Sequence, residues 1–318
     1  MTRRLREFIL EGVLIALCLV LAWRAPGFLS ADNLLNVLHN VSMQGVIAFG
    51  MTMVIIAGEI DLSVGSMIAF AGCLTAWITG RLSAAPHGWP MPRAILLAIL
   101  ASLLAGVAIG SISGMLRVRF RVPTFISTLA WLTVLRGAAG LITNGFPLTP
   151  FPDWYNFIGA GHVWKVPFPA ILFLAVFLLI QFIMNYTTFG RSIYAVGGNA
   201  EAARLSGIHV PRVKIGVMAI VSALAVIAGV MQSSQNMSGS DRSGMGWELD
   251  VIAAVIIGGT NLMGGSGRVW GTLIGVIFLG VLVNGMTLLN ISEYWQMVVR
   301  GVLILMAVLM NVSPPERA

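Results

Sequence analysis

Charged residues are scarce in this sequence. Asp, Glu, Lys and Arg make up 10% of its 318 residues, whereas hydrophobic residues make up 58%. A soluble domain carries roughly a quarter charged residues, and one soluble core stops growing at about 250–300 residues. The composition therefore excludes a soluble protein. A bilayer can accommodate such a chain as helices of about 20 apolar residues, whose backbone groups are hydrogen-bonded internally.

Cysteine and clustered histidine are also missing. The two cysteines, Cys18 and Cys73, lie in apolar runs, where they indicate membrane-core residues and not a disulfide framework. The four histidines are far apart and lack the spacing of metal ligands: His39, His87, His162 and His209. We therefore predict no metal site.

No motif of a known catalytic centre occurs. The sequence has no GxxxxGK[ST] loop for ATP phosphates, no nucleophile elbow and no zinc-binding HExxH. We predict that the chain is not an enzyme and binds no cofactor; if ATP drives its function, ATP and Mg belong to a partner ATPase. The net charge of +7 does not indicate nucleic-acid binding, because the Lys and Arg residues lie between apolar runs.

The sequence does contain ten apolar runs. We predict that they form about ten transmembrane helices of an all-α membrane protein, with a single domain over residues 1–318. The runs cover about 8–23, 37–57, 64–80, 94–116, 123–143, 168–185, 215–235, 249–264, 269–290 and 296–312. The first run could pass for a secretory signal. Nine further runs follow it and no small-residue cleavage site ends it, so we interpret it as an uncleaved span.

Basic residues predict the orientation. With a cytoplasmic N-terminus, twelve Lys and Arg residues lie inside, five lie outside, and Arg136 and Arg300 lie within spans. Positive residues favour the cytoplasmic side. We therefore predict that both termini and the segment 187–214 are cytoplasmic.

Two short sequence matches indicate an internal duplication. The matched pairs are Glu59-Ile-Asp61 with Glu248-Leu-Asp250, and Arg136-Gly137 with Arg300-Gly301. They flank or occupy the third and eighth runs and the fifth and tenth runs, respectively. Five spans per half give the two halves opposite orientations, so the matches predict the 5+5 inverted repeat that is common in transporters. Chance similarity is the alternative.

Charged side chains at membrane depth cost about 2.5–3.5 kcal/mol on insertion scales. The arginines and acidic residues of these matches are therefore candidates for gating or for fixing helix positions. For Arg136 we predict a buried ion pair, with Asp61 as the first candidate partner and Glu59 as the second. Arg300 either pairs with an acidic residue or extends to the outer interface.

Polar residues form a stripe in the second run. Asn36, Asn40 and Gln44 recur every fourth residue and so share one helix face. Amides of this kind hydrogen-bond hydroxyl-rich solutes, so we predict that this face lines the outer half of a substrate pathway. Contact with lipid headgroups is the alternative.

Glycine ladders predict close helix packing and no particular function. They comprise Gly106, Gly110 and Gly114 in the fourth run, and Gly267, Gly271 and Gly275 at the start of the ninth.

The longest segment on the predicted cytoplasmic side runs from Thr187 to Lys214. Asn199 can cap a short helix that ends before Gly207. We predict one short helix on the cytoplasmic face; a solvated linker is the alternative. Glycines in this segment would allow sharp turns around the helix: Gly190, Gly197, Gly198 and Gly207.

Four stretches closely resemble the permeases of ribose-type monosaccharide ABC transporters. They are GEIDLSVGSM (58–67), RVPTFISTLA (121–130), FGRSIYAVGGNAEAARLSGI (189–208) and ELDVIAAVIIGGTNLMGGSGRVWGTLIGV (248–276). The resemblance runs from about Pro26 to the C-terminus. One residue departs from the common family form of the first stretch, Gly-Gly-Ile-Asp, because Glu59 replaces the second glycine.

This resemblance implies the rest of a transport system. A second permease copy or a paralogue completes the pathway in the bacterial inner membrane. A periplasmic binding protein delivers a monosaccharide such as ribose, a related polyol or autoinducer-2, and a cytoplasmic ATPase with two nucleotide-binding domains drives alternating access. The family's ATPase-contacting loop is matched through Gly190, Arg191, Gly197, Gly198, Asn199 and Ala203. The small side chain of Ala203 suits a helix face seated in a groove of the ATPase.

The main alternative is an ion- or proton-coupled secondary transporter, with Glu59, Asp61 and Arg136 as an intramembrane relay. Inverted repeats suit that class as well. The two classes differ in their dependence on other subunits, because a secondary transporter works without an ATPase. The absence of a catalytic constellation disfavours a membrane enzyme.

Overall fold

The computed structural model describes residues 9–84 and 88–311, and this part of the chain is mostly helical. Its helices are α2 (Ile9–Arg24), α3 (Ala31–Ile56), α4 (Val64–Ser83), α5 (Met91–Phe120), α6 (Thr124–Thr143), the 3-10 helix η1 (Asp153–Asn156), α7 (Phe157–Ala160), α8 (Phe168–Tyr186), α9 (Thr188–Gly198), α10 (Ala200–Leu205), α11 (Val210–Gln235), α12 (Trp247–Ile257), α13 (Val269–Leu288) and α14 (Glu293–Asn311). A short antiparallel hairpin pairs β1 (His162–Val163) with β2 (Val166–Pro167). The prediction of an all-α membrane protein is confirmed.

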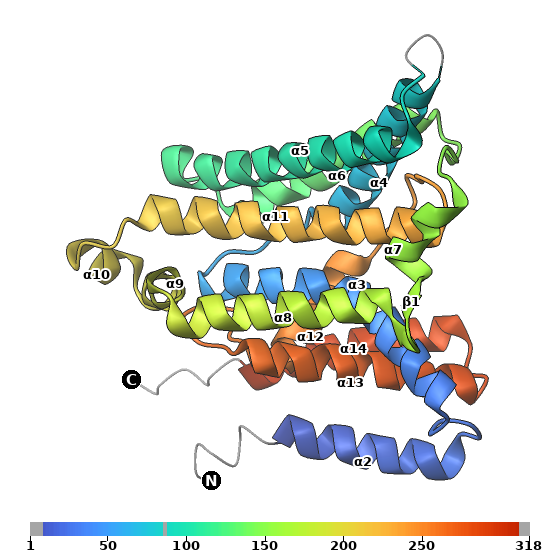
Figure 1. The fold of residues 1–318 in the computed structure, drawn as a ribbon. Coiled ribbons are helices and arrows are strands. Elements are labelled where there is room, and N and C mark those ends of the chain that lie inside the picture. Colours follow the sequence, from blue (N-terminus) through green and yellow to red (C-terminus); the bar gives the residue numbers. More distant parts are fainter. Residues whose placement is uncertain (1–8, 85–87, 312–318) are drawn as a thin grey trace.

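Two helices of 26 residues, α3 and α11, form the centre of the bundle. Helix α11 packs on α3, α4 and α5, and α3 also packs on α8, α12 and α13. Figure 1 shows α4, α5 and α6 on one side of this centre and α12, α13 and α14 on the other, with α2 outermost. Residues 41–56 of α3 are buried except for Gln44, which is partly exposed. The apolar core of the molecule therefore surrounds the second half of α3.

The bundle has two distinct ends. Figure 1 shows α9 and α10 at one end, which we call the α10 end, and α7 with the β1–β2 hairpin at the other, which we call the hairpin end. The hairpin end is fixed to α11: Tyr155 Oη lies 2.9 Å from Ser233 Oγ, and the Gly159 amide donates to Ser234 Oγ at 2.8 Å. The segment from η1 to α7 therefore covers the last turns of α11.

A break separates α3 from α4. Helix α3 ends at Ile56, and Gly58 has φ +77°, a conformation that suits glycine. The unwound segment 57–63 then returns toward the middle of the bundle (Figure 1). A Cβ atom on Gly229, in the last third of α11, would lie 2.6 Å from the Ile68 carbonyl oxygen in α4. Helix α4 therefore begins beside the middle of α11, not at the end of the bundle.

A second break, the unwound segment 236–246, precedes α12. Gly246 has φ +81° and caps a helix of only 11 residues, which is about 16 Å long at 1.5 Å per residue. The start of α12 meets the first turn of α4, because a Cβ atom on Gly65 would lie 2.6 Å from the Gly244 carbonyl oxygen. The predicted span over 249–264 is therefore corrected to a short helix followed by the glycine-rich segment 258–268.

By length and composition, six of the described helices could cross a membrane: α3, α5, α6, α8, α11 and α13. The other four predicted runs correspond to α2, α4, α12 and α14. Helices α4 and α12 begin in the interior of the bundle, so each covers only part of its depth.

The glycine ladders lie where helices touch. A Cβ atom on Gly110 of α5 would lie 2.4 Å from the Met218 carbonyl oxygen in α11. One on Gly275 of α13 would lie 2.1 Å from the Ala254 carbonyl oxygen in α12. The prediction of close helix packing at these ladders is confirmed.

The contact at Gly110 predicts a large effect of one methyl group. Gly110→Ala should lower the free energy of unfolding by about 1–3 kcal/mol, because the backbone of α11 cannot move away without repacking. Thermal unfolding of the purified protein in detergent measures this. Gly12→Ala in α2 is the control, since a Cβ atom there has nothing within 4 Å. Equal melting temperatures for the two variants would contradict the packing argument.

Candidate functional site

The first turn of α12 carries two acidic side chains, Glu248 and Asp250. Carboxylates are stabilised at a helix N-terminus, because the free peptide N–H groups there carry partial positive charge. The break before α12 places this turn against the first turn of α4, in the interior of the bundle. Two acidic groups therefore lie at a depth where a continuous span would have apolar side chains.

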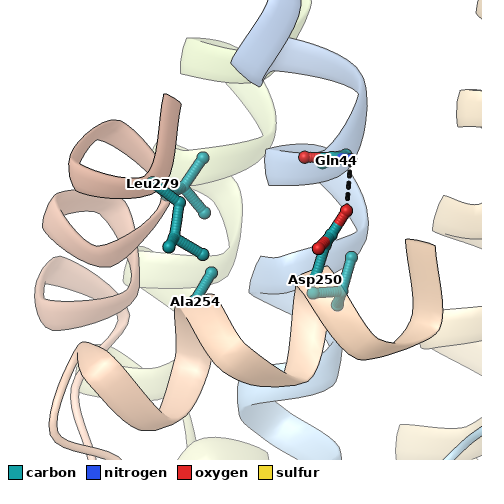
Figure 2. A pocket seen from close by; sticks show the side chains of 6 residues that line it. Gln44, Asp250, Ala254 and Leu279 are labelled. Atoms are coloured by element: carbon teal, nitrogen blue, oxygen red, sulfur yellow. Dashed lines mark hydrogen bonds between the residues drawn. The ribbon is translucent and has the colours of Figure 1, made fainter. Parts of the chain in front are cut away.

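Asp250 connects α12 to α3 and α14. Its Oδ2 atom accepts hydrogen bonds from Arg300 Nη1 at 3.0 Å and from Gln44 Nε2 at 3.3 Å. Figure 2 shows Gln44 and Asp250 facing each other between α3 and α12. The Arg300 and Asp250 side chains are 25% and 17% exposed. Of the two alternatives for Arg300, the structure has the ion pair.

A small cavity adjoins Gln44 and Asp250, lined also by Val251, Ala254, Val276 and Leu279 (Figure 2). Its volume is about 10 Å³, which is room for roughly one water molecule. A monosaccharide is therefore too large for this cavity.

The predicted polar stripe leads to this cluster. Asn36 and Asn40 are exposed near the start of α3, and Gln44 is partly buried against Asp250. Beside the stripe, His39 Nε2 lies 3.2 Å from Gln235 Nε2 of α11. A polar surface therefore runs from the hairpin end of α3 to the Asp250–Arg300 ion pair.

Arg136 does not pair with Asp61 or Glu59, and that prediction is wrong. Its Nη1 atom donates to the carbonyl oxygens of Asp241 and Ser243, the latter at 2.9 Å. These carbonyls belong to the unwound segment 236–246. Non-helical backbone within a membrane must find its hydrogen bonds inside the protein. The Arg136 guanidinium therefore binds backbone carbonyl groups of the break before α12, and not the carboxylate that we predicted.

The same face of α6 also accepts hydrogen bonds from the backbone of the break after α3. Thr124 Oγ1 accepts a hydrogen bond from the Ile60 amide at 3.2 Å, and Thr128 Oγ1 accepts one from the Leu62 amide at 3.1 Å. Arg136 lies two helical turns beyond Thr128 on that face. Helix α6 therefore supplies hydrogen-bonding partners to both unwound segments.

Two carboxylates in the interior keep one oxygen without a hydrogen-bond partner, Asp61 Oδ2 and Glu248 Oε2. The other oxygen of Asp61 accepts from the Ser63 amide at 2.8 Å and from Ser63 Oγ at 2.6 Å, which fixes the start of α4. Glu248 Oε2 lies over Gly65, where a Cβ atom would come within 2.0 Å, and Arg136 acts on this carboxyl electrostatically. Asp61 therefore does not make the ion pair with Arg136 that we expected.

Glu59 has partners that the sequence did not indicate. Its side chain is 3% exposed, and its Oε1 atom pairs with Arg117 Nε at 2.8 Å and with Lys214 Nζ. Its Oε2 atom accepts from Thr124 Oγ1 at 2.8 Å. Both cations stand at the ends of apolar runs, and a sequence alone does not show which helix ends meet. We call these four residues the Glu59 network.

The segment 187–214 contains two helices, α9 and α10, where we predicted one. Asn199 caps α10 with hydrogen bonds from the Glu201 and Ala202 amides at 3.0 and 2.9 Å, and Gly207 follows the helix with φ +83°. The predicted cap and stop are confirmed. The last residues of the segment form the first turn of α11.

Three of the four glycines lie within helix α9 and do not form sharp turns, which corrects the sequence interpretation. Gly190, Gly197 and Gly198 lie inside α9. A Cβ atom on Gly190 would lie 2.3 Å from the Ile183 carbonyl oxygen, and one on Gly197 would lie 1.7 Å from that of Ile56. Glycine is therefore needed at these two positions because α9 lies directly on α8 and on the end of α3.

Ala203 faces inward, contrary to its expected role as a contact for a partner. It is 4% exposed and belongs to the core. The exposed residues of α10 are Glu201, Ala202, Arg204 and Leu205, and Leu205 is 76% exposed. Hydrogen bonding from Arg204 lowers the pKa of the Glu201 carboxyl. Arg191 of α9 is also exposed.

Comparison with known proteins identifies the family. The family model described as "Branched-chain amino acid transport system / permease component" matches residues 33–308. The chain belongs to this permease family. The ribose import permease protein RbsC of Escherichia coli is 41% identical over 302 residues, which cover 94% of this chain and 91% of that relative. No solved structure matches the chain.

Other relatives of this permease carry similar names. RbsC of Haemophilus influenzae is 42% identical over 308 residues, covering 96% of this chain and 91% of the relative. The xylose transport system permease protein XylH of Escherichia coli is 34% identical over 376 residues, covering 99% and 93%. The resemblance to ribose-type ABC permeases is therefore confirmed, as is the prediction that the permease is a transport component and not an enzyme.

The described residues contain no cluster of metal-binding side chains. No group of three or more His, Cys, Asp and Glu side chains among residues 9–84 and 88–311 could hold a metal ion. The chemistry of its interior is hydrogen bonding and ion pairing.

The Asp250–Arg300 pair predicts coupled effects on stability. Asp250→Asn and Arg300→Met should each lower the free energy of unfolding by about 1.5–3 kcal/mol, the range for hydrogen bonds to charged groups. The double variant should lose less than the sum, because both changes remove the same interaction. Unfolding of the permease in detergent measures the cycle, with Arg242→Met, at an exposed arginine, as control. Additive losses would show that the two side chains do not interact.

Proposed function

We propose that this permease is the membrane-spanning subunit of an ATP-driven ABC importer for a small sugar. The observation that carries the proposal is the 41% identity to a ribose import permease over 94% of the chain. The family description names branched-chain amino acids, but three relatives with 41%, 42% and 34% identity are named for ribose or xylose. Ribose is therefore the first substrate to test, followed by xylose, other small polyols and autoinducer-2.

The proposed route follows the polar surface of α3. Asn36 and Asn40 offer exposed amides to sugar hydroxyl groups near the hairpin end, and Gln44 leads to the Asp250–Arg300 pair. Amide and carboxylate groups can exchange water for sugar hydroxyls at little net cost. Because the cavity at Gln44 holds only about one water molecule, passage of a sugar requires the helices around α12 to separate.

The proposed membrane arrangement has ten spans, with both termini and α9–α10 in the cytoplasm. The hairpin end then faces the periplasm of a bacterial inner membrane. The inverted repeat would match α2–α6 with α8 and α11–α14. Two features support it: α3 and α11 both have 26 residues, and an unwound segment follows each of them.

The proposed partners divide the work of transport. A second copy of this permease or a paralogue completes the pathway, a periplasmic binding protein delivers the sugar, and a cytoplasmic ATPase with two nucleotide-binding domains binds ATP and Mg. The exposed face of α10, which includes Leu205, is the proposed contact for that ATPase. Movement of α10 would then tilt the helices as rigid bodies and alternate the access.

A secondary transporter remains the second candidate. The relay that it requires is not present as expected, because Glu59 pairs with Arg117 and Lys214 while Arg136 binds backbone carbonyls. Energy dependence separates the two candidates.

Reconstitution tests the proposed function. In proteoliposomes with the ATPase and the binding protein, radiolabelled ribose should accumulate only when ATP is present on the ATPase side, and a protonophore should not abolish uptake. The permease alone, given a proton gradient, is the matched control. Uptake by the permease alone that collapses with the protonophore would establish the secondary transporter instead.

Two neighbouring alanines test the ATPase contact. Ala202→Trp adds bulk on the exposed face of α10, so the permease should remain folded while co-purification with the ATPase and ribose uptake fall on the order of tenfold, as overpacking costs about 1–3 kcal/mol. Ala203→Trp adds the same bulk inside the permease and should lower its own stability. Normal ATPase binding by the Ala202→Trp protein would place the contact elsewhere.

A further inference from the structure

The Glu59 network joins elements that are far apart in the sequence. Glu59 lies in the unwound segment 57–63, Arg117 in the last turn of α5, Thr124 in the first turn of α6 and Lys214 in the second turn of α11. Arg117, Thr124 and Lys214 each contact the Glu59 carboxylate. The network is therefore a junction of four chain segments near the α10 end.

One arm of this junction leads to α10. Only residues 206–209 separate α10 from α11. This turn is held at both sides: the Ile208 amide donates to the Ala203 carbonyl oxygen at 3.0 Å, and His209 Nδ1 accepts from the Arg212 amide at 3.3 Å. Lys214 follows within one further turn of helix. A displacement of α10 therefore moves the Lys214 ammonium with it.

Another arm leads into the middle of the bundle. Thr124 binds both the Glu59 carboxylate and the Ile60 amide. It begins α6, the helix whose Arg136 holds the carbonyl groups of the segment before α12. A movement of the Glu59 segment therefore acts on α6 and, through it, on the start of α12.

The electrostatics of the site make this connection stiff. The Glu59 side chain is 3% exposed and that of Lys214 is 11% exposed. Separating the two would leave a buried charge without its counter-ion, which is far less favourable than keeping the pair. Lys214 and Glu59 therefore move together when the helices shift.

We propose that Glu59 is a positioning residue for transport, which transmits movement of α10 to α6 through the Lys214–Glu59–Thr124 connection. This inference rests on the proposed function, because it assumes that the ATPase acts on α10. A merely structural role for Glu59 would affect the amount and stability of the permease, but not the number of sugars moved per ATP.

The test uses the full complex of permease, ATPase and binding protein in proteoliposomes, with radiolabelled ribose and ATP hydrolysis measured together. Glu59→Gln keeps the shape of the side chain and removes its charge. We expect the ribose moved per ATP hydrolysed to fall on the order of tenfold, within the usual range of coupling between sites. ATP hydrolysis itself should continue. Lys214→Met should have the same effect while Arg117 and Thr124 still hold Glu59, so it tests the connection with a milder change to the fold.

A second buried contact provides the control. Thr75 Oγ1 and Ser102 Oγ lie 2.9 Å apart between α4 and α5. Thr75→Val should lower the melting temperature without changing the ribose-to-ATP ratio. The Glu59→Gln, Lys214→Met double variant should have no lower a ratio than either single variant, since both remove one connection.

The outcomes distinguish failure of the proposed function from failure of the proposed role of Glu59. If the unmodified complex shows no ATP-dependent ribose uptake, the proposed function fails for ribose. If the unmodified complex transports ribose and the assembled Glu59→Gln and Lys214→Met complexes keep its ribose-to-ATP ratio, the role of Glu59 is overturned while the proposed function stands. A fall in the ratio that Thr75→Val reproduces at equal loss of stability would also overturn it.

Discussion

Unwound backbone inside a membrane bundle must have all its hydrogen bonds provided by the protein, and much of this structure depends on that constraint. The chain breaks twice within the bundle, after α3 and before α12. Water satisfies such groups in a soluble protein, but lipid cannot. Helix α6 provides Thr124 and Thr128 for the first break and Arg136 for the second. The position of α6 is therefore tied to both breaks at once.

The breaks also explain why charged groups are tolerated in the interior. Each break ends at a helix N-terminus, where carboxylates are favoured, and Asp61 and Asp250 occupy these places at α4 and α12. Arg300 and Gln44 both donate hydrogen bonds to the Asp250 carboxylate. A continuous span would offer no such positions. The charged and polar groups in the interior are thus a consequence of interrupting two helices.

Between the breaks, the helices form rigid pairs. The glycines of α5 place it directly on the backbone of α11, and those of α13 place it on α12. Surfaces in such close contact shift as units and do not deform gradually. The parts that can change position relative to one another are therefore the groups of helices on either side of the breaks. The Glu59 network lies where several of these groups meet.

Much of the local structure could be predicted from the sequence. The shortage of charge required a membrane, the apolar runs gave the helices, Asn199 and Gly207 gave the limits of α10, and the ladders gave the closest helix contacts. These features depend on composition or on neighbours along the chain. The four resembling stretches also pointed to the family that residues 33–308 match.

Tertiary structure decided the depth of α4 and α12, the partners of Arg136 and Glu59, and the inward face of Ala203. Hydropathy indicates that a run is apolar but not how deep in the bundle it starts. The partner of a charge depends on which helix ends meet in space, and residues such as Glu59 and Lys214 are separated by several spans in the sequence. Such contacts exist only once the whole bundle is packed, because the free energy of burying each charge is set by groups that folding brings to it.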